Sequence, residues 1–189
     1  MIYWNMWTRI LFALWFFLPA GLSNTTPVFA AKMPFLKKFS YPADFYKKLN
    51  GKRILGDHKT IRGFIVGILT AIMITALEKQ IYLNSEWVRG IVPLNYGSFD
   101  VLLFGFLSGA GALLGDSVKS FFKRQLEIKP GKAWIPFDQI DYIIGGILFT
   151  LLYVRLDAIE YLLIFIIWAI LHPLSTITGY LLKLKSEPI

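Results

Sequence analysis

The sequence of 189 residues contains no cysteine and few charged residues. Without cysteine the chain has no disulfide framework, no thiolate ligand for a metal ion and no cysteine nucleophile. Charged residues make up 17% of the chain, below the roughly 25% that is usual in soluble globular domains. Acidic residues are the scarcer kind, 12 against 20 Lys and Arg, so the net charge is +8.

Hydrophobic residues, in contrast, make up 56% of the chain. A disordered chain would be polar and a fibrous chain would be repetitive, and this sequence is neither. A soluble nucleic-acid-binding protein could carry the positive excess, but it would not contain apolar runs of this length. We therefore expect an integral membrane protein, folded as one domain over residues 1–189, with no nucleic-acid partner.

Five apolar runs approach the length of about 20 residues with which a helix crosses the hydrocarbon core. They predict an all-α, polytopic membrane protein with transmembrane helices at residues 4–22, 63–83, 101–115, 140–154 and 161–182. The third and fourth runs are short, so their ends should extend into the polar flanks or lie against neighbouring helices. The first run could instead belong to a cleaved signal peptide, but its length and aromatic flank favour a membrane span.

Basic residues are distributed unevenly between the connecting segments. Sixteen lie in residues 23–62, residues 116–139 and the C-terminal tail, whereas the opposite side has three, Lys79, Arg89 and Arg155, and Arg9 lies inside the first run. Basic residues accumulate on the cytoplasmic side of membrane proteins. The sequence therefore predicts a multi-pass protein of the cell membrane, with the N-terminus outside and the two long loops and the C-terminus in the cytoplasm.

Local sequence features predict how some of these helices end and pack. Residues Ser23–Pro27 have turn chemistry, which predicts the end of the first helix. Glycines 105, 109, 111 and 115 in the third run should let a neighbouring helix, or a lipid substrate, approach closely, and helix packing is the favoured interpretation. His172-Pro173 should open the last helix, as a structural kink rather than as a catalytic histidine.

The segment Gly51–Gly63, directly before the second run, is too polar to be a simple connection. Its glycines, its cations, a hydroxyl group and the helix N-terminus that follows suit an anionic phosphate chain. The alternative is an anchor that obeys the positive-inside rule, which would require the cations but neither the glycines nor Asp57. We favour phosphate binding.

A second polar cluster follows the third run. Five polar residues recur there at helical spacing: Asp116, Lys119, Ser120, Lys123 and Arg124. They share one face if the third helix continues beyond the membrane, and Pro130-Gly131 should end it. Asp138 and Asp141 then lie on one face at the start of the fourth run.

Three carboxylates, Asp116, Asp138 and Asp141, should therefore converge at the cytoplasmic surface. Hard oxygen ligands beside a phosphate site suit Mg²⁺. Salt bridges to neighbouring lysines are the alternative, preferred for Asp138 or Asp141 alone, whereas the three together favour a metal. The residues thus predict a membrane enzyme that handles a phosphorylated substrate with Mg²⁺, a chemistry that needs positioning and charge neutralisation more than a protein nucleophile.

One motif resembles the signature of the CDP-diacylglycerol synthases (phosphatidate cytidylyltransferases): Ser120-Phe121-Phe122-Lys123-Arg124, then Lys129, Pro136 and Asp138-Gln139-Ile140-Asp141. The chain departs from that signature where Pro130 replaces an Asp, where a His-Gly-Gly is missing and where Gln139 replaces an Arg. The chain is more similar to the archaeal branch of the family, the CDP-archaeol synthases. The features that carry this similarity are these departures, the short length, Asn24-x-x-Pro27 and the segment from Gly56 to Gly63.

The resemblance implies a cytidylyltransferase of archaeal phospholipid biosynthesis. It would combine CTP with unsaturated archaetidic acid, a geranylgeranyl ether of glycerol phosphate, to give CDP-archaeol and pyrophosphate at the cytoplasmic face. The implied catalytic residues are Asp116, Lys123, Arg124, Asp138 and Asp141, with the three aspartates as Mg²⁺ ligands. The implied substrate contacts are Asn24, Lys52, Arg53, Asp57, Lys59, Thr60 and Arg62.

Two other classes of protein are alternatives. Another Mg²⁺-dependent lipid phosphotransferase, of the CDP-alcohol type, would carry Asp-Gly-x-x-Ala-Arg, which does not occur here. A small membrane transporter would place charges at mid-membrane and would often contain inverted repeats. Arg9 and Glu78 apart, the charges of this chain gather at one face, which disfavours a transporter.

Overall fold

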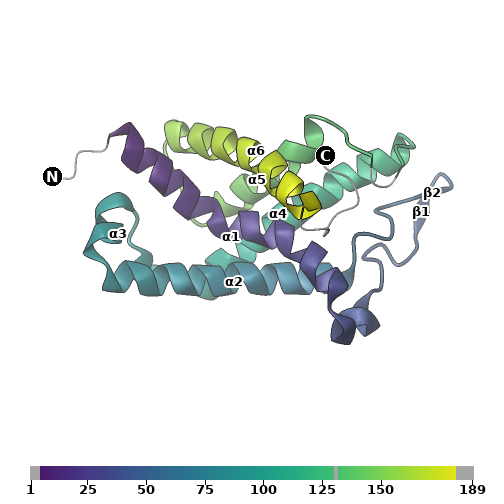
Figure 1. Cartoon of the computed structure of the whole chain (residues 1–189), viewed down its shortest axis with the longest axis horizontal. Coiled ribbons are helices and arrows are strands. Elements are labelled where there is room, and N and C mark those ends of the chain that lie inside the picture. Colours follow the sequence, from purple (N-terminus) through teal and green to yellow (C-terminus); the bar gives the residue numbers. More distant parts are fainter. Residues whose placement is uncertain (1–4, 130–131, 182–189) are drawn as a thin grey trace.

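The structure, a computed structural model, describes residues 5–129 and 132–181. In this part of the chain there are six α-helices: α1 (Met6–Lys32), α2 (Ile61–Asn84), α3 (Glu86–Ile91), α4 (Val101–Gln125), α5 (Phe137–Thr150) and α6 (Ala158–Leu181). The segment between α1 and α2 contains the 3-10 helix η1 (Pro34–Phe39) and the antiparallel strands β1 (Lys48–Leu49) and β2 (Lys52–Arg53). A second 3-10 helix, η2 (Tyr96–Ser98), precedes α4. Figure 1 shows the long helices side by side, with the two strands at the opposite end from α3.

Four helices are long and apolar enough to cross a membrane: α1, α2, α4, and α6 as far as Thr178. Helix α5 has 14 residues and is therefore about 21 Å long, whereas the hydrocarbon core is about 30 Å thick. It packs against α4, α6 and α1. The all-α membrane architecture is confirmed, and five complete spans stay a prediction.

Helix α1 corrects the predicted boundary of the first loop. The helix does not end near Leu22 but continues through Pro27 to Lys32. The Ser23 hydroxyl is buried and donates to the Gly109 carbonyl of α4 at 3.4 Å, and the Thr25 hydroxyl donates one turn back at 3.1 Å. Because these polar groups are bonded inside the bundle, they do not terminate the helix. The prediction of a turn at Ser23–Pro27 is wrong.

The other helix ends differ less from the sequence prediction. Helix α4 continues to Gln125, as the spacing of the second polar cluster required, while Pro130-Gly131 lies outside the described residues. Helix α5 begins and ends earlier than the predicted residues 140–154. Its end is at Thr150, where the chain turns, and the Tyr153 hydroxyl then accepts a hydrogen bond from the Asp100 amide at 2.7 Å. Helix α6 passes through Pro173 without the expected interruption, and the Thr176 hydroxyl donates to the His172 carbonyl at 3.1 Å.

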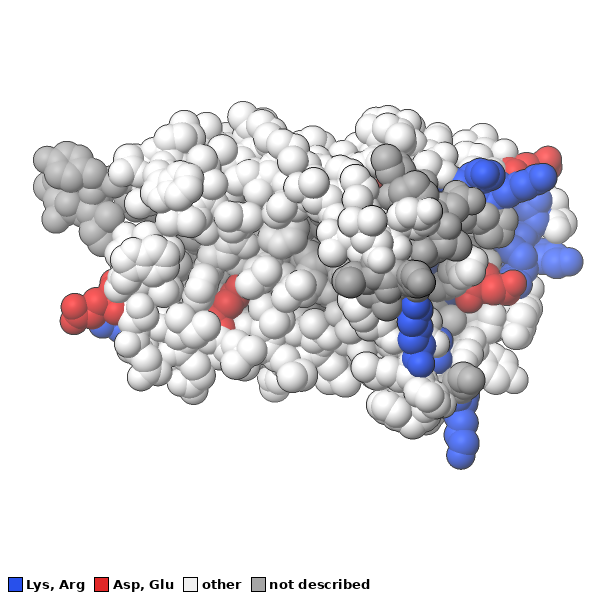
Figure 2. Space-filling model, in the orientation of Figure 1, with Lys and Arg blue, Asp and Glu red and all other residues white. Residues whose placement is uncertain are grey.

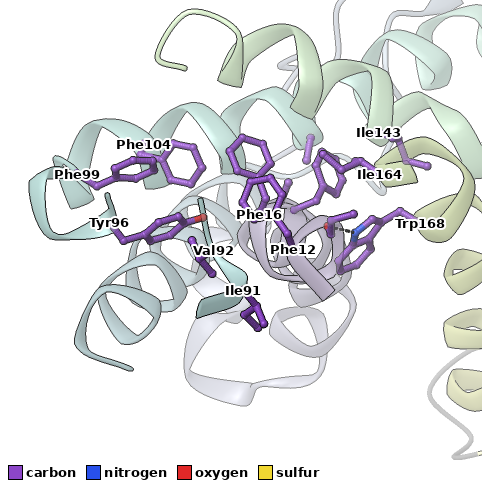
Figure 3. Close-up of a cluster of buried hydrophobic side chains, with 14 of the residues drawn as sticks. Phe12, Phe16, Ile91, Val92, Tyr96, Phe99, Phe104, Ile143, Ile164 and Trp168 are labelled. Atoms are coloured by element: carbon purple, nitrogen blue, oxygen red, sulfur yellow. Dashed lines mark hydrogen bonds between the residues drawn. The ribbon is translucent and has the colours of Figure 1, made fainter. Parts of the chain in front are cut away.

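The apolar core lies toward the end of the bundle that carries α3. Phe12 and Phe16 of α1 pack there among side chains from η2, α4 and α6 (Figure 3). Trp168 of α6 donates through its indole nitrogen to the Ala13 carbonyl at 3.2 Å, the contact drawn as a dashed line. This core fixes α1 against α6 and leaves the opposite end of the bundle for polar side chains.

Charged side chains are concentrated at that opposite end. On the face shown in Figure 2 most Lys and Arg side chains lie where β1 and β2 are in Figure 1, and the middle of the molecule is largely uncharged. Arg9, the charge inside the first predicted span, forms an ion pair with the buried Glu160 of α6. Pairing of this kind is how a charge is tolerated in an apolar bundle.

Glycines set the distance between α4 and α5. A Cβ atom added at Gly145 would lie 2.2 Å from the Gly111 carbonyl oxygen, and one added at Gly115 would lie 2.3 Å from the Asp141 carbonyl oxygen. The two backbones are therefore in direct contact, as the small-residue spacing of the third run predicted. The contact places the start of α5 beside the last turns of α4.

The substitution Gly145→Ala tests this contact. The added methyl group meets backbone atoms that cannot rotate away, so we expect a destabilisation of about 1–3 kcal/mol, or a Tm lower by about 2–4 °C for each kcal/mol. Thermal unfolding of the purified protein in detergent measures it. Leu148→Ala, on an exposed position of the same helix, is the matched control and should change Tm little. Equal Tm values for Gly145→Ala and the unmodified protein would contradict the close contact.

Candidate functional site

A cavity of about 570 Å³ lies at the charged end of the bundle. The second half of α1, the start of α2, the last turns of α4 and the start of α5 surround it, and α6 contributes His172 and Thr176. Apolar side chains form part of its wall, among them Val28, Phe64 and Leu113. The remaining wall is polar and includes a cluster of charged side chains.

Lys119 lies at the centre of the charged cluster. Its Nζ atom is 2.9 Å from Asp116 Oδ1, 2.9 Å from Asp138 Oδ1 and 2.9 Å from Asp141 Oδ2. The Lys119 side chain is 14% exposed and that of Asp141 is 7% exposed. One ammonium group thus holds together three carboxylates that come from two helices.

Two more lysines complete the cluster. Lys59, which precedes α2, forms an ion pair with the second oxygen of Asp116. Lys123 Nζ lies 3.1 Å from both oxygens of Asp138 and donates to the Lys132 carbonyl at 2.5 Å. Asp138 also accepts a hydrogen bond from the Trp134 amide at 2.5 Å. Three carboxylates and three ammonium groups therefore balance in charge along one wall of the cavity.

The start of α2 forms the neighbouring wall. Thr60 caps this helix by accepting a hydrogen bond from the Gly63 amide at 3.1 Å, and both residues line the cavity. Gly63 packs against Pro27 of α1, where an added Cβ would lie 3.2 Å from the proline side chain. The partial positive charge of the helix N-terminus is therefore directed at the cavity, which favours an anionic ligand.

A buried aspartate organises the loop that leads to α2. Asp44 accepts hydrogen bonds from Arg53 at 2.8 and 3.1 Å, from the Leu55 amide at 2.9 Å and from the Gly56 amide at 3.1 Å. Burial by itself would raise the pKa of Asp44, but Arg53 and the amides of Leu55, Gly56 and Tyr46 together hold that pKa well below its usual range. Asp44 thus fixes the segment that carries Lys59 and Thr60.

The structure brings seven of the predicted site residues together. Asn24, Lys59, Thr60, Asp116, Lys123 and Asp138 line the cavity, and Asp141 joins them through Lys119. Five others do not line the cavity: Lys52, Arg53, Asp57, Arg62 and Arg124.

These five residues instead hold the loop and its neighbours in place. Lys52 donates to the Gln125 carbonyl at 2.7 Å and pairs with Glu127. Arg53 bridges Asp44 and Asp57, and Arg62 is buried and donates to the Leu36 carbonyl at 3.1 Å. The Arg124 side chain lies beside Gly56, whose φ is +88°.

Sequence reasoning left several lining residues out of the predicted site. They are Lys32, His58, Ser117, Lys119, Lys132, His172 and Thr176. A signal existed for Lys119, because its spacing places it on the same helical face as Asp116 and Lys123. Nothing in the local pattern linked His172 or Thr176 to the site, since the contact of α6 with the other helices is set by tertiary packing.

The donor set in this wall suits a divalent cation. Among the described residues no group of three or more His, Cys, Asp or Glu side chains is arranged to hold a metal ion. Three carboxylates nevertheless converge on one point, and Asp141 Oδ2 is buried and accepts no hydrogen bond in the described part of the chain, although Lys119 Nζ is 2.9 Å away. Hard oxygen donors of this kind fit Mg²⁺ bound jointly with phosphates.

The helices and the cavity define a multi-pass membrane protein with a balanced Asp–Lys cluster at one end of its bundle. A family model described as CarS-like CDP-archaeol synthase matches residues 6–189. The chain therefore belongs to the CDP-archaeol synthase family, and it is an enzyme, a cytidylyltransferase.

Individual proteins agree with this assignment. The CDP-archaeol synthase of Methanopyrus kandleri is 35% identical over 96% of this chain and 95% of its own length. That of Methanospirillum hungatei is 38% identical over 90% of this chain and 99% of its own length. A solved structure of an intramembrane enzyme of archaeal membrane lipid biosynthesis superimposes with a TM-score of 0.71 at 28% identity, covering 89% of this chain and 94% of that one.

The substitution Asp44→Asn tests how the loop is held. It removes the charged acceptor of Arg53 and of the Leu55 and Gly56 amides, an effect of about 1.5–3 kcal/mol, so hydrogen exchange in residues 44–57 should be faster by about ten- to a hundredfold. Since its pKa is lowered in the folded protein, Asp44 stabilises the loop above the unfolded pKa of about 3.9 and loses that effect only as the pH falls below it. Exchange measured by mass spectrometry from pH 5 to 8 should therefore change only through its intrinsic rate.

The control for this experiment is Glu127→Gln, which removes an exposed carboxylate that pairs with Lys52. It should leave exchange in residues 44–57 unchanged. If Asp44→Asn gave the same exchange as this control, Asp44 would not organise the loop.

Proposed function

We propose that the protein transfers the cytidylyl group of CTP to the phosphate of unsaturated archaetidic acid, forming CDP-archaeol and pyrophosphate in archaeal phospholipid biosynthesis. The observation that supports this most is the alternation of three aspartates with Lys59, Lys119 and Lys123 in the wall of one cavity. A divalent cation suits the carboxylates, and phosphate groups suit the lysines. The cavity volume of about 570 Å³ lies within the range of about 300–1,000 Å³ for ligand sites.

The reaction needs no protein nucleophile. A non-bridging oxygen of the lipid phosphate attacks the α-phosphorus of CTP and forms the new P–O bond. The bond from the α-phosphorus to the oxygen that bridges to the β-phosphorus breaks, and pyrophosphate leaves with that electron pair. Because the attacking oxygen is already ionised, the protein has only to align the two substrates and stabilise negative charge.

The residues of the cavity have different roles in aligning the substrates and stabilising negative charge. Asp116, Asp138 and Asp141 would hold Mg²⁺, which supplies neutralisation of phosphate charge when it is bound. Lys59 and Lys123 bind phosphate oxygens, and the N-terminus of α2 at Thr60 adds its partial positive charge.

The surrounding residues complete the site. Asn24 faces the nucleotide from α1. Five residues contribute to phosphate binding indirectly, because they fix the loop that carries Lys59: Lys52, Arg53, Asp57, Arg62 and Arg124.

The apolar part of the cavity wall suits the lipid substrate. Val28 and Ala31 of α1 face the cavity together with Phe64 of α2, at the end of helices whose outer surfaces are apolar. A lipid whose phosphate reaches Lys59 and Lys123 can thus keep its chains beside these residues. The reaction then takes place at the boundary between the bilayer and water, where the lipid chains stay in the bilayer and the phosphate groups reach the cavity.

Asp138→Asn and Asp141→Asn test the proposed reaction. With CTP, the ether-lipid phosphate and Mg²⁺, the unmodified protein should release pyrophosphate, and each variant should lower kcat by about 10²–10³-fold, the range for loss of one preorganised electrostatic contact. ATP, GTP and UTP should be poorer substrates than CTP. A coupled pyrophosphate assay together with thin-layer detection of the labelled lipid product measures both.

The control is Asp100→Asn at the other end of α4. Asp100 caps that helix by accepting a hydrogen bond from the Leu103 amide at 3.0 Å, and Asn caps equally well, so turnover should be retained. Full turnover in both Asp138→Asn and Asp141→Asn would refute the metal-site assignment, and faster product formation with another nucleotide would refute the specificity for CTP.

We also propose that the cavity faces the cytoplasm. Because the chain has no cysteine, single cysteines can be introduced at Ser40, in the loop before α2, and at Ser98, in η2; both positions are exposed. A membrane-impermeant maleimide applied to intact cells should label Ser98→Cys but not Ser40→Cys, and inverted vesicles should show the reverse. Labelling of Ser40→Cys in intact cells would overturn the orientation.

A further inference from the structure

Lys119 differs from the other lysines of the cavity in the number of carboxylates that it contacts. Lys59 and Lys123 each pair with one aspartate, whereas Lys119 Nζ is 2.9 Å from a carboxylate oxygen of all three. No other described lysine or arginine forms ion pairs with three acids. The three carboxylates and Lys119 together are called here the Asp cage.

A cation at the centre of the Asp cage is electrostatically favourable. Three carboxylates held within a few ångströms repel one another strongly when they are buried. The close contact between α4 and α5 at Gly115 and Gly145 keeps the two helix backbones, and with them the carboxylates, near one another. A cation between them relieves this repulsion and so stabilises the start of α5.

An ammonium group and a divalent cation cannot fill the cage together. One oxygen of each carboxylate is 2.9 Å from Lys119 Nζ, whereas Mg²⁺ binds oxygen at about 2.0–2.1 Å. The present cage is thus too wide for the metal, and its centre is the position of the ammonium nitrogen. Asp141 Oδ2 is buried and directed at that same centre, 2.9 Å from Lys119 Nζ.

We infer that Lys119 is a positioning residue that acts as a placeholder cation: it holds the three carboxylates together before the divalent cation binds and leaves the cage when it does. The inference rests on the proposed function, because it assumes that the three aspartates hold a divalent cation. Lys119 lines the cavity beside Lys123 and Lys132, so an ammonium that leaves the cage enters the space for phosphate groups. Metal binding thereby adds a cation to the phosphate site.

Binding of Mn²⁺, a paramagnetic substitute for Mg²⁺, tests the inference without using turnover. In Lys119→Met no ammonium has to be displaced, so Mn²⁺ should bind more tightly than in the unmodified protein. The apparent Kd equals the intrinsic value divided by the fraction of molecules with a free cage. If Lys119 fills nine-tenths of the cages or more, the gain is about tenfold or more. Electron paramagnetic resonance of free Mn²⁺ in titrations measures it.

Stability and a control lysine provide the second readout of the same variant. In EDTA, Lys119→Met should melt at a lower temperature than the unmodified protein, and Mn²⁺ should restore its Tm. Lys79→Met, which removes a lysine that donates to the Phe99 carbonyl at the other end of the bundle, should alter neither Mn²⁺ affinity nor the response to EDTA. Equal Mn²⁺ affinity in Lys119→Met and the unmodified protein would overturn the inference, as would a loss of Tm that Mn²⁺ does not repair.

A measurement on the unmodified protein keeps the inference testable if Lys119→Met does not fold. Amine-directed labelling followed by mass spectrometry should modify Lys119 slowly in EDTA, several-fold faster with Mg²⁺, and slowly again when CTP is added, while Lys79 stays constant. Labelling of Lys119 that does not respond to Mg²⁺ would overturn the inference. If the unmodified protein and Asp141→Asn bound Mn²⁺ equally weakly with and without CTP, the proposed metal site itself would be wrong, which is a different result from the failure of Lys119 alone.

Discussion

The backbone contact between α4 and α5 is the constraint on which the site depends. It exists because Gly111, Gly115 and Gly145 present no side chain, and it fixes the first turn of α5 beside the last turns of α4. Two aspartates of α5 are thereby held next to Asp116 at a distance that carboxylates would not adopt on their own. The positive charges of Lys59, Lys119 and Lys123 offset the repulsion between the carboxylates. Helix packing therefore brings the aspartates together, and the lysines stabilise the cluster that results.

The apolar bundle also limits where the charges of the chain can lie. An apolar bundle tolerates ionised groups only when they are paired or reach water. The Asp–Lys cluster meets both conditions, since its ammonium and carboxylate groups balance and its lysines line a cavity at the end of the helices. Arg9 and Glu160 meet the first condition at the opposite end. Most other charges lie in the loops, where they hold the segment before α2.

Much of this arrangement could be predicted from the sequence, because helical spacing and apolar run length are local properties. The common face of Asp116, Lys119 and Lys123, and the extension of α4 that it requires, follow from spacing alone. The end of α1 could not be predicted, because the Ser23 hydroxyl donates a hydrogen bond to a carbonyl of α4, a contact that no local pattern reveals. For the same reason the basic residues before α2 look alike in sequence, yet Lys59 reaches the cavity and Arg53 is held by Asp44.

The acidic residues show why sequence reasoning reached two interpretations. Metal binding and salt bridges to lysines were alternatives for Asp116, Asp138 and Asp141, and the geometry gives both the same centre. The Lys119 ammonium lies among the three carboxylates and is carried by a flexible side chain that also lines the cavity. The proposed exchange of this ammonium for a divalent ion would therefore leave the carboxylates paired with a cation throughout. In the exchange proposed for Lys119, the two interpretations are successive states of one site, in which the ammonium that stabilises the empty cage would become a phosphate ligand as the metal enters.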